Sequence, residues 1–548
     1  MTKYIFVVGG VMSGVGKGVT ASSLGRILVS RGLKVTMMKI DPYINVDAGT
    51  MNPTEHGEVF VLSDGYETDQ DMGNYERFLD TTLDRGNYMT TGMIYKSVIE
   101  RERNLEYGGK CVEVVPHIPL EVIDRIKRAG KKHVADVCIV EIGGTVGEYQ
   151  NLLFLEAARM MKYQSPKNVL VALVSYLPIP GTIGEMKTKP TQYAVQTLRG
   201  TGLQAEIIVA RATEKLDSKR KEKLALACGV ERADIVSAPD CRSIYEVPLL
   251  LESEGLGDRV CAKLRLKSKR STLKNWTKQY ELSQQSATEV RIAVVGKYFQ
   301  TGNYVLSDSY LSVIEALKHA AVANGTKLKL TWIDSESYEK DSGKLRELEG
   351  FDGVLVPGGF GSRGVEGIIA AIHHCRVKGI PFFGICYGMQ LAVVEYARSV
   401  MGLKDANTTE VNAKTKNPLI DILPEQRKLL KAKQYGASMR LGSYSAPIRP
   451  GTLVAKLYGT KSLSERHRHR YEVSPAYHSA LEAAGLVFGA TSADGTLVET
   501  IELPARVHPF YLAVQYHPEF QSSLRSPHPI FVGFISAALP AKRSKARK

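Results

Sequence analysis

The chain has 548 residues, enough for two or three domains, and its 72 basic and 57 acidic side chains give a net charge of +15. Such a charge suits nucleic acid or polyphosphate ligands, but no aromatic residues interleave with the basic runs as a single-strand-binding groove would require, so we expect no nucleic-acid partner. The seven cysteines lack disulfide-framework or zinc-site spacing, and neither a signal peptide nor a membrane-length apolar run is present, so we expect a cytoplasmic protein without membrane contact.

The first expected element is a strand over residues 4–8 that leads into a glycine-rich loop. Residues 9–18 read Gly-Gly-Val-Met-Ser-Gly-Val-Gly-Lys-Gly, and an amphipathic helix follows. A glycine-rich loop between strand and helix cradles phosphate with its backbone N–H groups, and Lys17 would reach the terminal phosphates. Gly18, however, stands where the usual phosphate loop has Ser or Thr for magnesium, so the metal would need other ligands.

Two acidic residues are candidates for that metal. Glu141 ends the apolar strand expected over 137–140, which is a usual place for a metal-linked carboxylate in phosphoryl-transfer domains. Asp71 ends the acidic stretch 64–71, which could equally be a solvated loop. Another short strand runs into Lys39, which places a second lysine beside the glycine-rich loop.

A third basic site follows the strand expected over residues 169–174. Residues 187–192 read Lys-Thr-Lys-Pro-Thr-Gln and come after a loop rich in proline and glycine. Three separated basic sites at strand ends exceed what one triphosphate needs, so they suit two bound nucleotides. Because these strands alternate with helical stretches, the pattern predicts a parallel sheet with helices on both faces.

Residues 266–290 are polar and poor in strands, which predicts an interdomain linker with a short helix around Trp276. The strand pattern then restarts at 291–295 and recurs at 353–356, 381–383 and 512–516. We therefore expect two consecutive α/β domains, at 1–265 and 291–535, followed by a basic tail at 536–548.

The strand expected at 381–383 runs into Gly384-Ile-Cys-Tyr-Gly388, which has the form of a nucleophile elbow with a thiol. The glycines permit a sharp turn from strand to helix. Cys386 would then project from a helix N-terminus, where the helix dipole favours the thiolate. Taken alone, the pattern also fits a buried cysteine in a glycine-rich turn.

Two further segments would complete a catalytic set around Cys386. The strand at 512–516 leads into His517-Pro-Glu519, and a carboxylate two residues from an imidazole can orient it as it exchanges protons with the thiol. Upstream, Val356-Pro-Gly-Gly-Phe-Gly361 is a strand followed by a glycine-rich loop. That loop can offer a backbone N–H to a developing oxyanion, with the Tyr387 N–H as second donor.

With these three motifs in this order, the C-terminal half resembles the triad type of glutamine amidotransferase. The resemblance implies that Cys386 forms a thioester on glutamine, that ammonia leaves, and that hydrolysis gives glutamate. It also implies that the oxyanion and the glutamine are held by Gly359, Tyr387, Gly388, Met389, Gln390, Glu410 and Arg470. Arg470 belongs to the run Arg-His-Arg-His-Arg-Tyr at 466–471, which could instead be a surface face.

Four segments of the N-terminal half match one family closely: Lys39–Asp47, His56–Val61, Glu141–Gly147 and Lys187–Gln192. Together with the C-terminal motifs, they make the chain resemble CTP synthases over about residues 2–535. The resemblance implies an α/β fold in two parts. The first is a P-loop-like, dethiobiotin synthetase-like parallel-sheet amidoligase domain, and the second is a triad-type glutamine amidotransferase domain.

In that family, ATP phosphorylates O4 of UTP, and ammonia from glutamine, or added ammonium, displaces the phosphate to give CTP for pyrimidine biosynthesis. The resemblance implies ATP as co-substrate, Mg2+ as the metal, GTP as allosteric activator, CTP as inhibitor and a homotetramer. For Mg-ATP it implies Gly14, Val15, Gly16, Lys17, Gly18, Val19, Lys39, Asp71 and Glu141, with Asp71 and Glu141 as metal ligands. For UTP or CTP it implies Ser13, Glu148, Tyr149, Gln150, Lys187, Thr188, Lys189, Pro190, Thr191, Gln192 and Lys223.

Two details of the resemblance concern ammonia transfer and feedback. Free ammonia would be lost to water or protonated, so a protected path is expected, and Pro53, His56 and Val59 match the family's gate; His56 could equally be a structural histidine. Gln150 stands where the family commonly has a second carboxylate, so feedback by CTP could differ in strength.

There are two rival hypotheses, of which the second belongs to a non-enzyme class. One is an amidoligase of the cobyrinate or dethiobiotin type with the same kinase-like loop, against which the segments 39–47 and 187–192 argue. The other is a nucleotide-sensing scaffold with a dead glutaminase. That scaffold predicts a broken triad, whereas Cys386, His517 and Glu519 are all present.

Overall fold

The computed structural model describes residues 1–52, 56–182, 184–286, 288–297, 300–301, 304–305, 307–423, 426 and 439–539. Contacts divide the chain into two compact units, Met1–Ala48 with Asp71–Tyr280, and Gly49–Gln70 with Glu281–Lys548. Residues 49–70, expected in the first domain from the sequence, thus belong by their contacts to the second unit. Their hydrogen bonds explain this, because the Val61 carbonyl accepts from Arg466 at 3.1 Å and the Ser63 carbonyl from the Ser443 N–H at 2.9 Å.

The first unit is built on a seven-stranded sheet in which every neighbouring pair is parallel. The strands are buried along nearly their whole length, as expected for a parallel sheet covered on both faces. In spatial order they are β5 (Tyr88–Thr90), β2 (Val35–Asp41), β6 (Val137–Ile142), β1 (Lys3–Gly10), β7 (Val169–Tyr176), β8 (Ile207–Ala212) and β9 (Ile235–Pro239).

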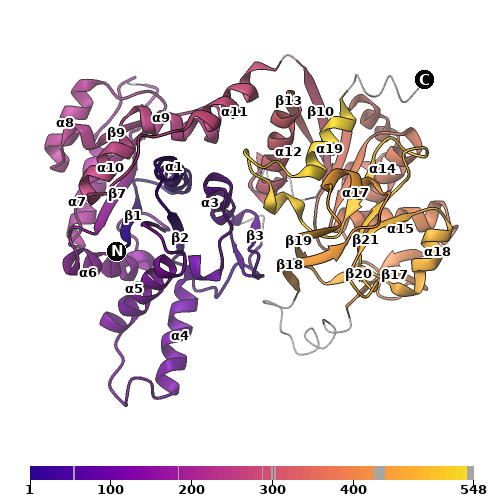
Figure 1. Cartoon of the computed structure of the whole chain (residues 1–548), viewed down its shortest axis with the longest axis horizontal. Coiled ribbons are helices and arrows are strands. Elements are labelled where there is room, and N and C mark those ends of the chain that lie inside the picture. Colours follow the sequence, from indigo (N-terminus) through magenta and orange to yellow (C-terminus); the bar gives the residue numbers. More distant parts are fainter. Residues whose placement is uncertain are drawn as a thin grey trace. The chain divides into compact units, whose positions relative to one another are not determined.

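Helices cover both faces of this sheet (Figure 1). One face carries α1 (Lys17–Ser30), α3 (Asp71–Leu79), α9 (Val247–Ser253) and α10 (Leu256–Leu264). The other carries α4 (Thr91–Arg103), α5 (Val114–Lys132), α6 (Leu152–Gln164), α7 (Lys189–Gly200) and α8 (Ser218–Cys228), whose apolar residues share one core with the strands. The sequence-based prediction of a parallel sheet between two helical layers is therefore confirmed.

The segment expected as a linker contains a helix, as predicted around Trp276: α11 spans Lys274–Gln285. Trp276 is buried, its indole N–H donates to the Tyr245 carbonyl at 2.7 Å, and its ring packs against Phe78 and Tyr245. This side chain attaches the start of the segment to the first unit, which is why that unit continues past the expected boundary at residue 265.

The second unit has its own seven-stranded sheet, in which five neighbouring strands pair in parallel and two more are added at one edge by antiparallel pairing. In spatial order the strands are β13 (Lys327–Asp334), β10 (Glu289–Gly296), β14 (Gly353–Val356), β15 (Phe382–Ile385), β23 (Tyr511–Val514), β22 (Val498–Glu502) and β21 (Val487–Thr491). The strand expected at 512–516 ends at Val514, so residues 515 and 516 leave the sheet just before His517.

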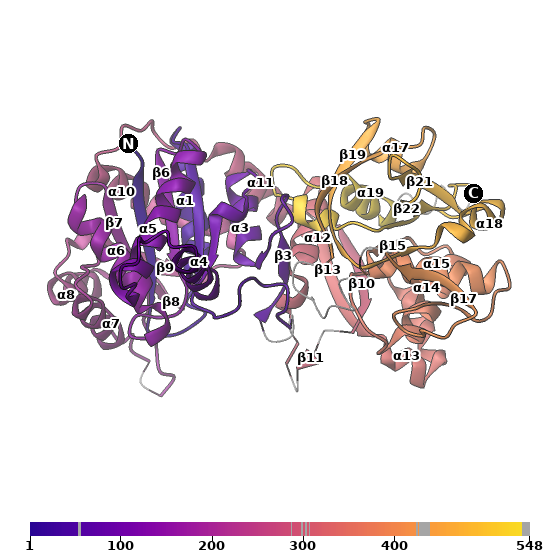
Figure 2. The same cartoon turned by 90° about the horizontal axis from the view of Figure 1, so that it is seen from below.

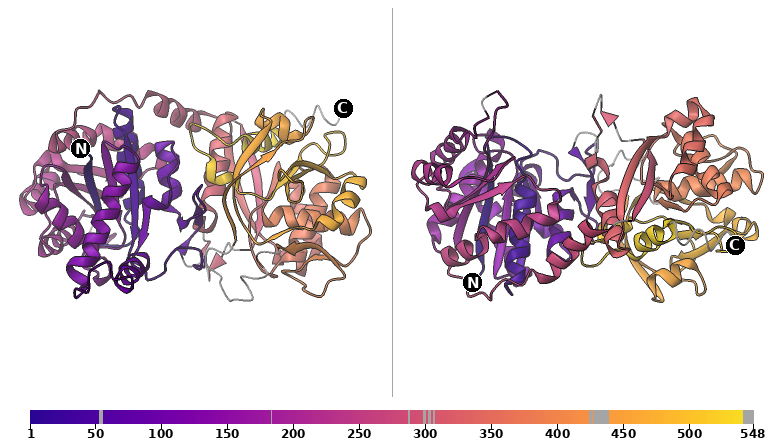
Figure 3. Two further views of the ribbon diagram at one scale, coloured as in Figure 1. Left: turned by 60° about the horizontal axis from the view of Figure 1, so that its bottom comes forward. Right: turned by 90° about the horizontal axis from the view of Figure 1, so that it is seen from above.

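Two separate cores flank this second sheet, and its layers can be followed in Figure 2 and in the two views of Figure 3. One core involves α14 (Val365–Lys378) and α15 (Tyr387–Ser399), with the short α13 (Glu336–Lys340) and α18 (His478–Ala483) nearby. The other involves α12 (Leu311–Ala323), α17 (Leu453–Tyr458) and α19 (Pro529–Ala538). Helix α19 extends three residues into the expected basic tail, whose residues 540–548 lie outside the described chain.

Small sheets complete the second unit. They are β3 (Val59–Val61) with β4 (Glu67–Asp69), β11 (Gln300–Thr301) with β12 (Tyr304–Val305), β16 (Ala406–Thr408) with β17 (Asn417–Ile422) and β20 (Tyr471–Val473), and β18 (Arg440–Pro447) with β19 (Ser462–His469). Across the described residues of both units, every helix is too short or too polar to cross a membrane.

Candidate active sites

Cys386 lies at the turn between β15 and α15, with a backbone φ of 51° and ψ of −99°. A positive φ is costly for a residue with a side chain, and such strain is typical of nucleophile elbows. Both flanking glycines are required, because a Cβ on Gly388 would collide with the Val356 carbonyl and one on Gly384 would lie 2.9 Å from Ala513. The structure thus produces the sharp turn that the sequence predicted.

His517 and Glu519 face each other beside the elbow. Nδ1 of His517 lies 2.7 Å from Oε1 of Glu519, and both side chains are buried. Burial alone would lower the pKa of His517, but the Glu519 carboxylate and the neighbouring Cys386 raise it to about 10. With Nδ1 held by the carboxylate, Nε2 is left to exchange a proton with the thiol, which is the arrangement of a catalytic triad.

A cavity lies over the triad, and the glycine-rich loop forms part of its wall. Gly358, Gly359 and Phe360 line this cavity together with Cys386 and His517. Gly358 must be glycine, because a Cβ there would come within 2.9 Å of the His517 ring. The loop predicted to offer an oxyanion donor is therefore placed beside the thiol.

Two of the predicted glutamine-binding residues lie close to this loop or to the elbow. Gln390 is buried on α15, and its side-chain N–H groups donate to the Tyr471 carbonyl at 3.0 Å and to Oε1 of Gln515 at 3.3 Å. Glu410 accepts a hydrogen bond from the Gly361 N–H at 2.7 Å. Burial raises the pKa of Glu410, while the charges of Lys297 and Arg470 oppose that rise, so both cations act on this carboxyl.

The basic run at 466–471 is not a surface face. Most of it forms β19, in which Arg466, His467 and His469 are almost completely buried. Arg466 lies over the ring of Phe60, and Arg468 pairs with Glu67 at 2.9 Å. The alternative interpretation as a solvated charge run is therefore wrong, because residues 466–469 of β19 are buried or half-buried.

Lys297 was not singled out by the sequence, yet it lies in this site. Its ammonium group donates to the Gly361 carbonyl at 2.7 Å and lies 4.5 Å from the centre of the Tyr387 ring. Burial lowers the pKa of Lys297 to about 8, against the opposing charge of Glu410. Only its place just after β10 could have marked it, because strand ends in a parallel sheet collect functional side chains.

In the first unit, the glycine-rich loop connects β1 to α1 as predicted. Gly14 and Gly16 have φ values of 71° and 89°, which residues with side chains rarely adopt, and α1 begins at Lys17. The ammonium of Lys17 donates to the Gly144 carbonyl at 2.9 Å. Burial lowers the pKa of Lys17, partly offset by the negative charge of Glu141.

Lys39 brings the two predicted metal ligands together. Its ammonium group pairs with Asp71 and lies 3.0 Å from Glu141 and 3.7 Å from Asp41, in a buried cluster. Burial would lower the pKa of Lys39, but Asp71 and Glu141 raise it well above its usual value. Asp71 therefore pairs with a buried lysine, and the interpretation of its segment as a merely solvated loop is wrong.

Gly18 explains how this loop departs from the usual phosphate-binding pattern. A Cβ at position 18 would collide with the carboxylate of Asp71. A common phosphate loop has the hydroxyl side chain of Ser or Thr at this position. In this chain the carboxylate of Asp71, from α3, occupies the space that such a side chain would take. A carboxylate is a suitable oxygen ligand for magnesium, so Asp71 would offer the oxygen that the loop itself lacks.

The residues predicted to bind the pyrimidine nucleotide fall into two groups. In the first, Glu148 accepts from the Thr145 N–H at 2.9 Å, and the exposed Gln150 donates to Glu148 at 2.6 Å. Burial would raise the pKa of Glu148, but the hydrogen bonds from Thr145 and Gln150 lower it. A carboxylate at position 150 could not donate this bond. Tyr149, between them, is 93% exposed.

The second group lies around the start of α7. Thr191 is buried and accepts from Ser175 of β7 at 2.9 Å, and a Cβ on Gly10 of β1 would come within 2.7 Å of the Ala194 Cβ, so α7 packs closely against the ends of β1 and β7. Lys187 pairs with Glu185, and Lys223 on α8 also lowers the pKa of that carboxyl. The remaining predicted members of the cluster are Thr188, Lys189, Pro190 and Gln192, at or next to the first turn of α7.

Of the three predicted gate residues, Val59 on β3 lines the cavity over Cys386. His56 is exposed, and Pro53 lies outside the described residues. Among the described residues, no group of three or more His, Cys, Asp or Glu side chains could by itself hold a metal ion. The Asp71 and Glu141 pair would therefore need phosphate or water oxygens to complete a magnesium shell.

The fold and these sites define an α/β amidoligase with a phosphate-binding loop, followed by a glutamine amidotransferase with a Cys-His-Glu triad. Residues 3–266 match the family model described as "CTP synthase N-terminus", and residues 305–537 match "Glutamine amidotransferase class-I". The chain is similar to the CTP synthases of Thermococcus gammatolerans, at 49% identity over 544 residues, and of Methanococcus maripaludis, at 50% over 543. These alignments cover 99% and 98% of this chain, and 99% of each relative.

Among solved structures, the glutaminase domain of Trypanosoma brucei CTPS with bound acivicin is 39% identical, covers 45% of this chain and 93% of its own, and has a TM-score of 0.42. Since relatives near 50% identity match over almost the full length, the chain belongs to the CTP synthase family. Members are glutamine-dependent carbon–nitrogen ligases that convert UTP to CTP with ATP as co-substrate.

Proposed function

We propose that this chain phosphorylates O4 of UTP with ATP in its first unit and replaces that phosphate with ammonia released from glutamine in its second. The Asp71 carboxylate seated against Gly18 is the observation that carries this proposal. It supplies, next to Lys17 and Lys39, the acidic group that a phosphoryl-transfer site needs and that the loop itself lacks.

In the glutaminase step, the Cys386 thiolate attacks the side-chain amide carbon of glutamine. Backbone N–H groups of Gly359 and Tyr387 would stabilise the oxyanion, and His517, oriented by Glu519, gives its proton to the leaving ammonia. Water then hydrolyses the thioester to glutamate, with His517 accepting the proton. Glu410, Gln390 and Arg470 would hold the glutamine.

In the synthetase step, pyrimidine O4 is a poor leaving group until it is phosphorylated. Lys17 would bind the terminal phosphates of ATP and Lys39 would neutralise charge as the phosphoryl group moves. Asp71 and Glu141 fit magnesium, which when bound would neutralise the charge of the transferred group. The cluster at 187–192, with Ser13 and Lys223, would bind the UTP phosphates.

The resemblance further supports activation of the glutaminase by GTP, inhibition by CTP and a homotetrameric assembly. It also supports a protected path for ammonia, of which Val59 would form the glutaminase end because it lines the cavity over Cys386. The Gln150–Glu148 hydrogen bond occupies the place where relatives commonly carry two carboxylates, and we expect it to alter how strongly CTP binds.

The decisive experiment incubates the protein with Mg-ATP, UTP and ammonium chloride, and follows CTP by absorbance and chromatography. Formation of CTP is expected, and also with glutamine as donor when GTP is present. A second reaction replaces UTP with a dicarboxylic or cobyrinate-type acceptor. Turnover of that acceptor without turnover of UTP would favour the rival amidoligase and overturn the proposal.

A further inference from the structure

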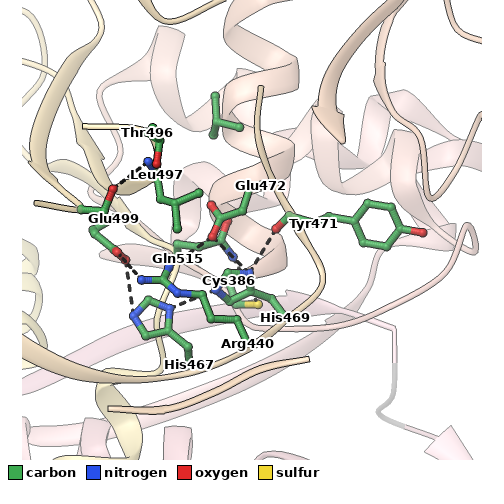
Figure 4. A network of polar contacts seen from close by, with 12 residues as sticks. Cys386, Arg440, His467, His469, Tyr471, Glu472, Thr496, Leu497, Glu499 and Gln515 are labelled. Carbon is green, nitrogen blue, oxygen red and sulfur yellow. Dashed lines mark hydrogen bonds and ion pairs between the residues drawn. The ribbon is translucent and has the colours of Figure 1, made fainter. Parts of the chain in front are cut away.

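A connected set of buried polar side chains includes Cys386 and extends away from it through Gln515 (Figure 4). Gln515 is at its centre, one residue beyond the end of β23 and fully buried. Its side-chain N–H group donates to the Cys386 sulfur at 3.6 Å, and its carbonyl oxygen accepts from Gln390 at 3.3 Å. One carboxamide therefore touches both the nucleophile and a residue proposed to hold glutamine.

The orientation of these two carboxamides follows from their partners. The Tyr471 carbonyl can only accept, so the group of Gln390 that lies 3.0 Å from it must be the NH2 group. The second hydrogen of that NH2 group then points to Gln515, which must present its oxygen there. This leaves the NH2 group of Gln515 to face the sulfur. Turning either amide over would place oxygen against oxygen or NH2 against NH2.

Two buried histidines hold the Tyr471 carbonyl in place. Nδ1 of His469 lies 3.2 Å from it and must carry the hydrogen, so Nε2 of His469 accepts from Nδ1 of His467 at 3.0 Å. Burial and the nearby Arg440 lower the pKa values of both histidines well below their usual range, which favours the neutral rings. The other ring nitrogen of His467, Nε2, lies 3.4 Å from Oε2 of Glu499.

Arg440 anchors the same set to the sheet. Its guanidinium pairs with the carboxylates of Glu472 at 3.2 Å and Glu499 at 2.7 Å. The backbone carbonyl of Glu499 in turn accepts a hydrogen bond from the backbone N–H of Gln515 at 2.9 Å. The backbone of Gln515 is thus fixed by β22 and its side chain by Gln390. Hydrogen bonds with a single compatible direction hold catalytic groups to within a fraction of an ångström.

We propose that Gln515 is a positioning residue for glutamine hydrolysis, holding the Cys386 sulfur with its NH2 group and Gln390 with its oxygen. This rests on the proposed glutaminase step at Cys386. Because both hydrogens of the Gln390 NH2 group are used, only its oxygen is left for the substrate. Gln515 therefore connects the negative charge on sulfur to the recognition of the substrate.

The test compares Gln515→Glu with Gln284→Glu, the same change at an exposed position of α11. Gln515→Glu keeps the side-chain shape but replaces the donor facing the sulfur with a carboxylate oxygen. We expect kcat for glutamine hydrolysis to fall about 10- to 100-fold, as for loss of a hydrogen bond to a charged group. We also expect the pH at which iodoacetamide alkylates Cys386 at half its maximal rate to move upward, with CTP formation from ammonium unchanged.

A Gln515→Glu protein whose alkylation profile and kcat match those of Gln284→Glu would overturn the proposal. If Gln515→Glu does not fold, Gln515→Asn, which draws the amide away from the sulfur, replaces it, and a parent-like profile in that variant also overturns the proposal. Glutamine hydrolysis by the unmodified chain tells a failure of this inference from a failure of the proposed glutaminase on which it rests. If it hydrolyses no glutamine, the proposed glutaminase itself is wrong; if it does, only the role of Gln515 is at stake.

Discussion

Lys297 illustrates how a single buried charge can report on the glutamine site. It is 4% exposed, and burial lowers its pKa from the ordinary 10.5 to about 8. The unfolded chain therefore holds a proton on this residue between about pH 8 and pH 10.5 that the folded chain does not. Stability rises with pH wherever the unfolded state binds more protons.

We accordingly expect Lys297 to make the second unit more stable as pH rises through this window, by at most roughly 3 kcal/mol. Lys297→Met should remove that contribution, so the difference in unfolding free energy between parent and variant should change across the window and be constant below it. Urea unfolding at a series of pH values measures this. Lys327→Met, at an exposed position on β13, is the control, and equal pH slopes for parent and Lys297→Met would contradict the prediction.

Gly18 supports a second prediction at the scale of one residue. Gly18→Ala should push the Asp71 carboxylate aside, because the new Cβ would collide with it. We expect CTP formation from either glutamine or ammonium to fall about 100-fold or more, since misplacing a catalytic group by about 1 Å has effects of that size. Glutamate release from glutamine should continue.

Gly200→Ala provides the matched control, because nothing lies within 4 Å of a Cβ at that exposed position. Its synthetase activity should equal that of the parent. Synthesis that survives Gly18→Ala would mean that Asp71 is not needed at that place.

At the scale of residues, the sequence was sufficient where the chemistry is local. The elbow, the His517-Pro-Glu519 motif and the glycine-rich loop are each a short continuous stretch of sequence, so the spacing within each stretch predicts its local geometry. Lys297 and Gln515 were not singled out, because their contacts are with neighbours contributed by distant segments; only the place of Lys297 after β10 could have marked it. The buried state of the run at 466–471 was equally invisible, since its composition is that of a surface.

Among the elements, the hairpin of β3 and β4 is the least predictable from the sequence. Its residues lie between α1 and α3 in the chain, yet their contacts make them part of the second unit. Glu58 precedes β3, and its carboxylate accepts from the N–H of Ser312 at 3.1 and 3.2 Å and from the Ser312 hydroxyl. Ser312 lies in the first turn of α12, so a carboxylate some 250 residues upstream caps this helix.

This cap predicts a coupling between stability and activity. Glu58→Gln keeps the size of the side chain but removes its charge, and we expect the second unit to lose about 1 to 2 kcal/mol in urea unfolding. Because Ser309 and Tyr310, just before α12, line the cavity with Cys386, kcat for glutamine hydrolysis should fall as well. Glu289→Gln, exposed at the start of β10, is the control. Unchanged stability in Glu58→Gln would exclude the capping role.

For the whole molecule, the order of strands and helices was predictable because both sheets are mainly parallel and therefore read as apolar runs separated by helices. The assignment of residues 49–70 was not, since contacts over long sequence separation leave no local pattern. The assignment of residues 49–70 matters for the proposed transfer of ammonia. The segment that carries the predicted gate residue Val59 belongs to the glutaminase unit and lines its cavity.

Two variants should separate the activities of the two units. Cys386→Ala removes the nucleophile, so it should form CTP from ammonium at the parental rate and none from glutamine. Lys17→Ala should lose synthesis from both donors, because Lys17 would neutralise charge in phosphoryl transfer, and it should still release glutamate. Loss of ammonium-dependent synthesis in Cys386→Ala would mean that this thiol supports the fold.

Mixing these two variants tests the protected path for ammonia. In the mixture, Lys17→Ala supplies ammonia from glutamine and Cys386→Ala can use it, but the ammonia must cross solvent. At neutral pH nearly all of it becomes ammonium, which is no nucleophile, so CTP formation from glutamine should stay below about one tenth of the parental rate. Adding ammonium chloride to the same mixture should restore synthesis and shows that the acceptor site is intact. A mixture that matches the parent with glutamine alone would show that ammonia reaches the synthetase site through solvent, and Val59 would then have no part in a gate.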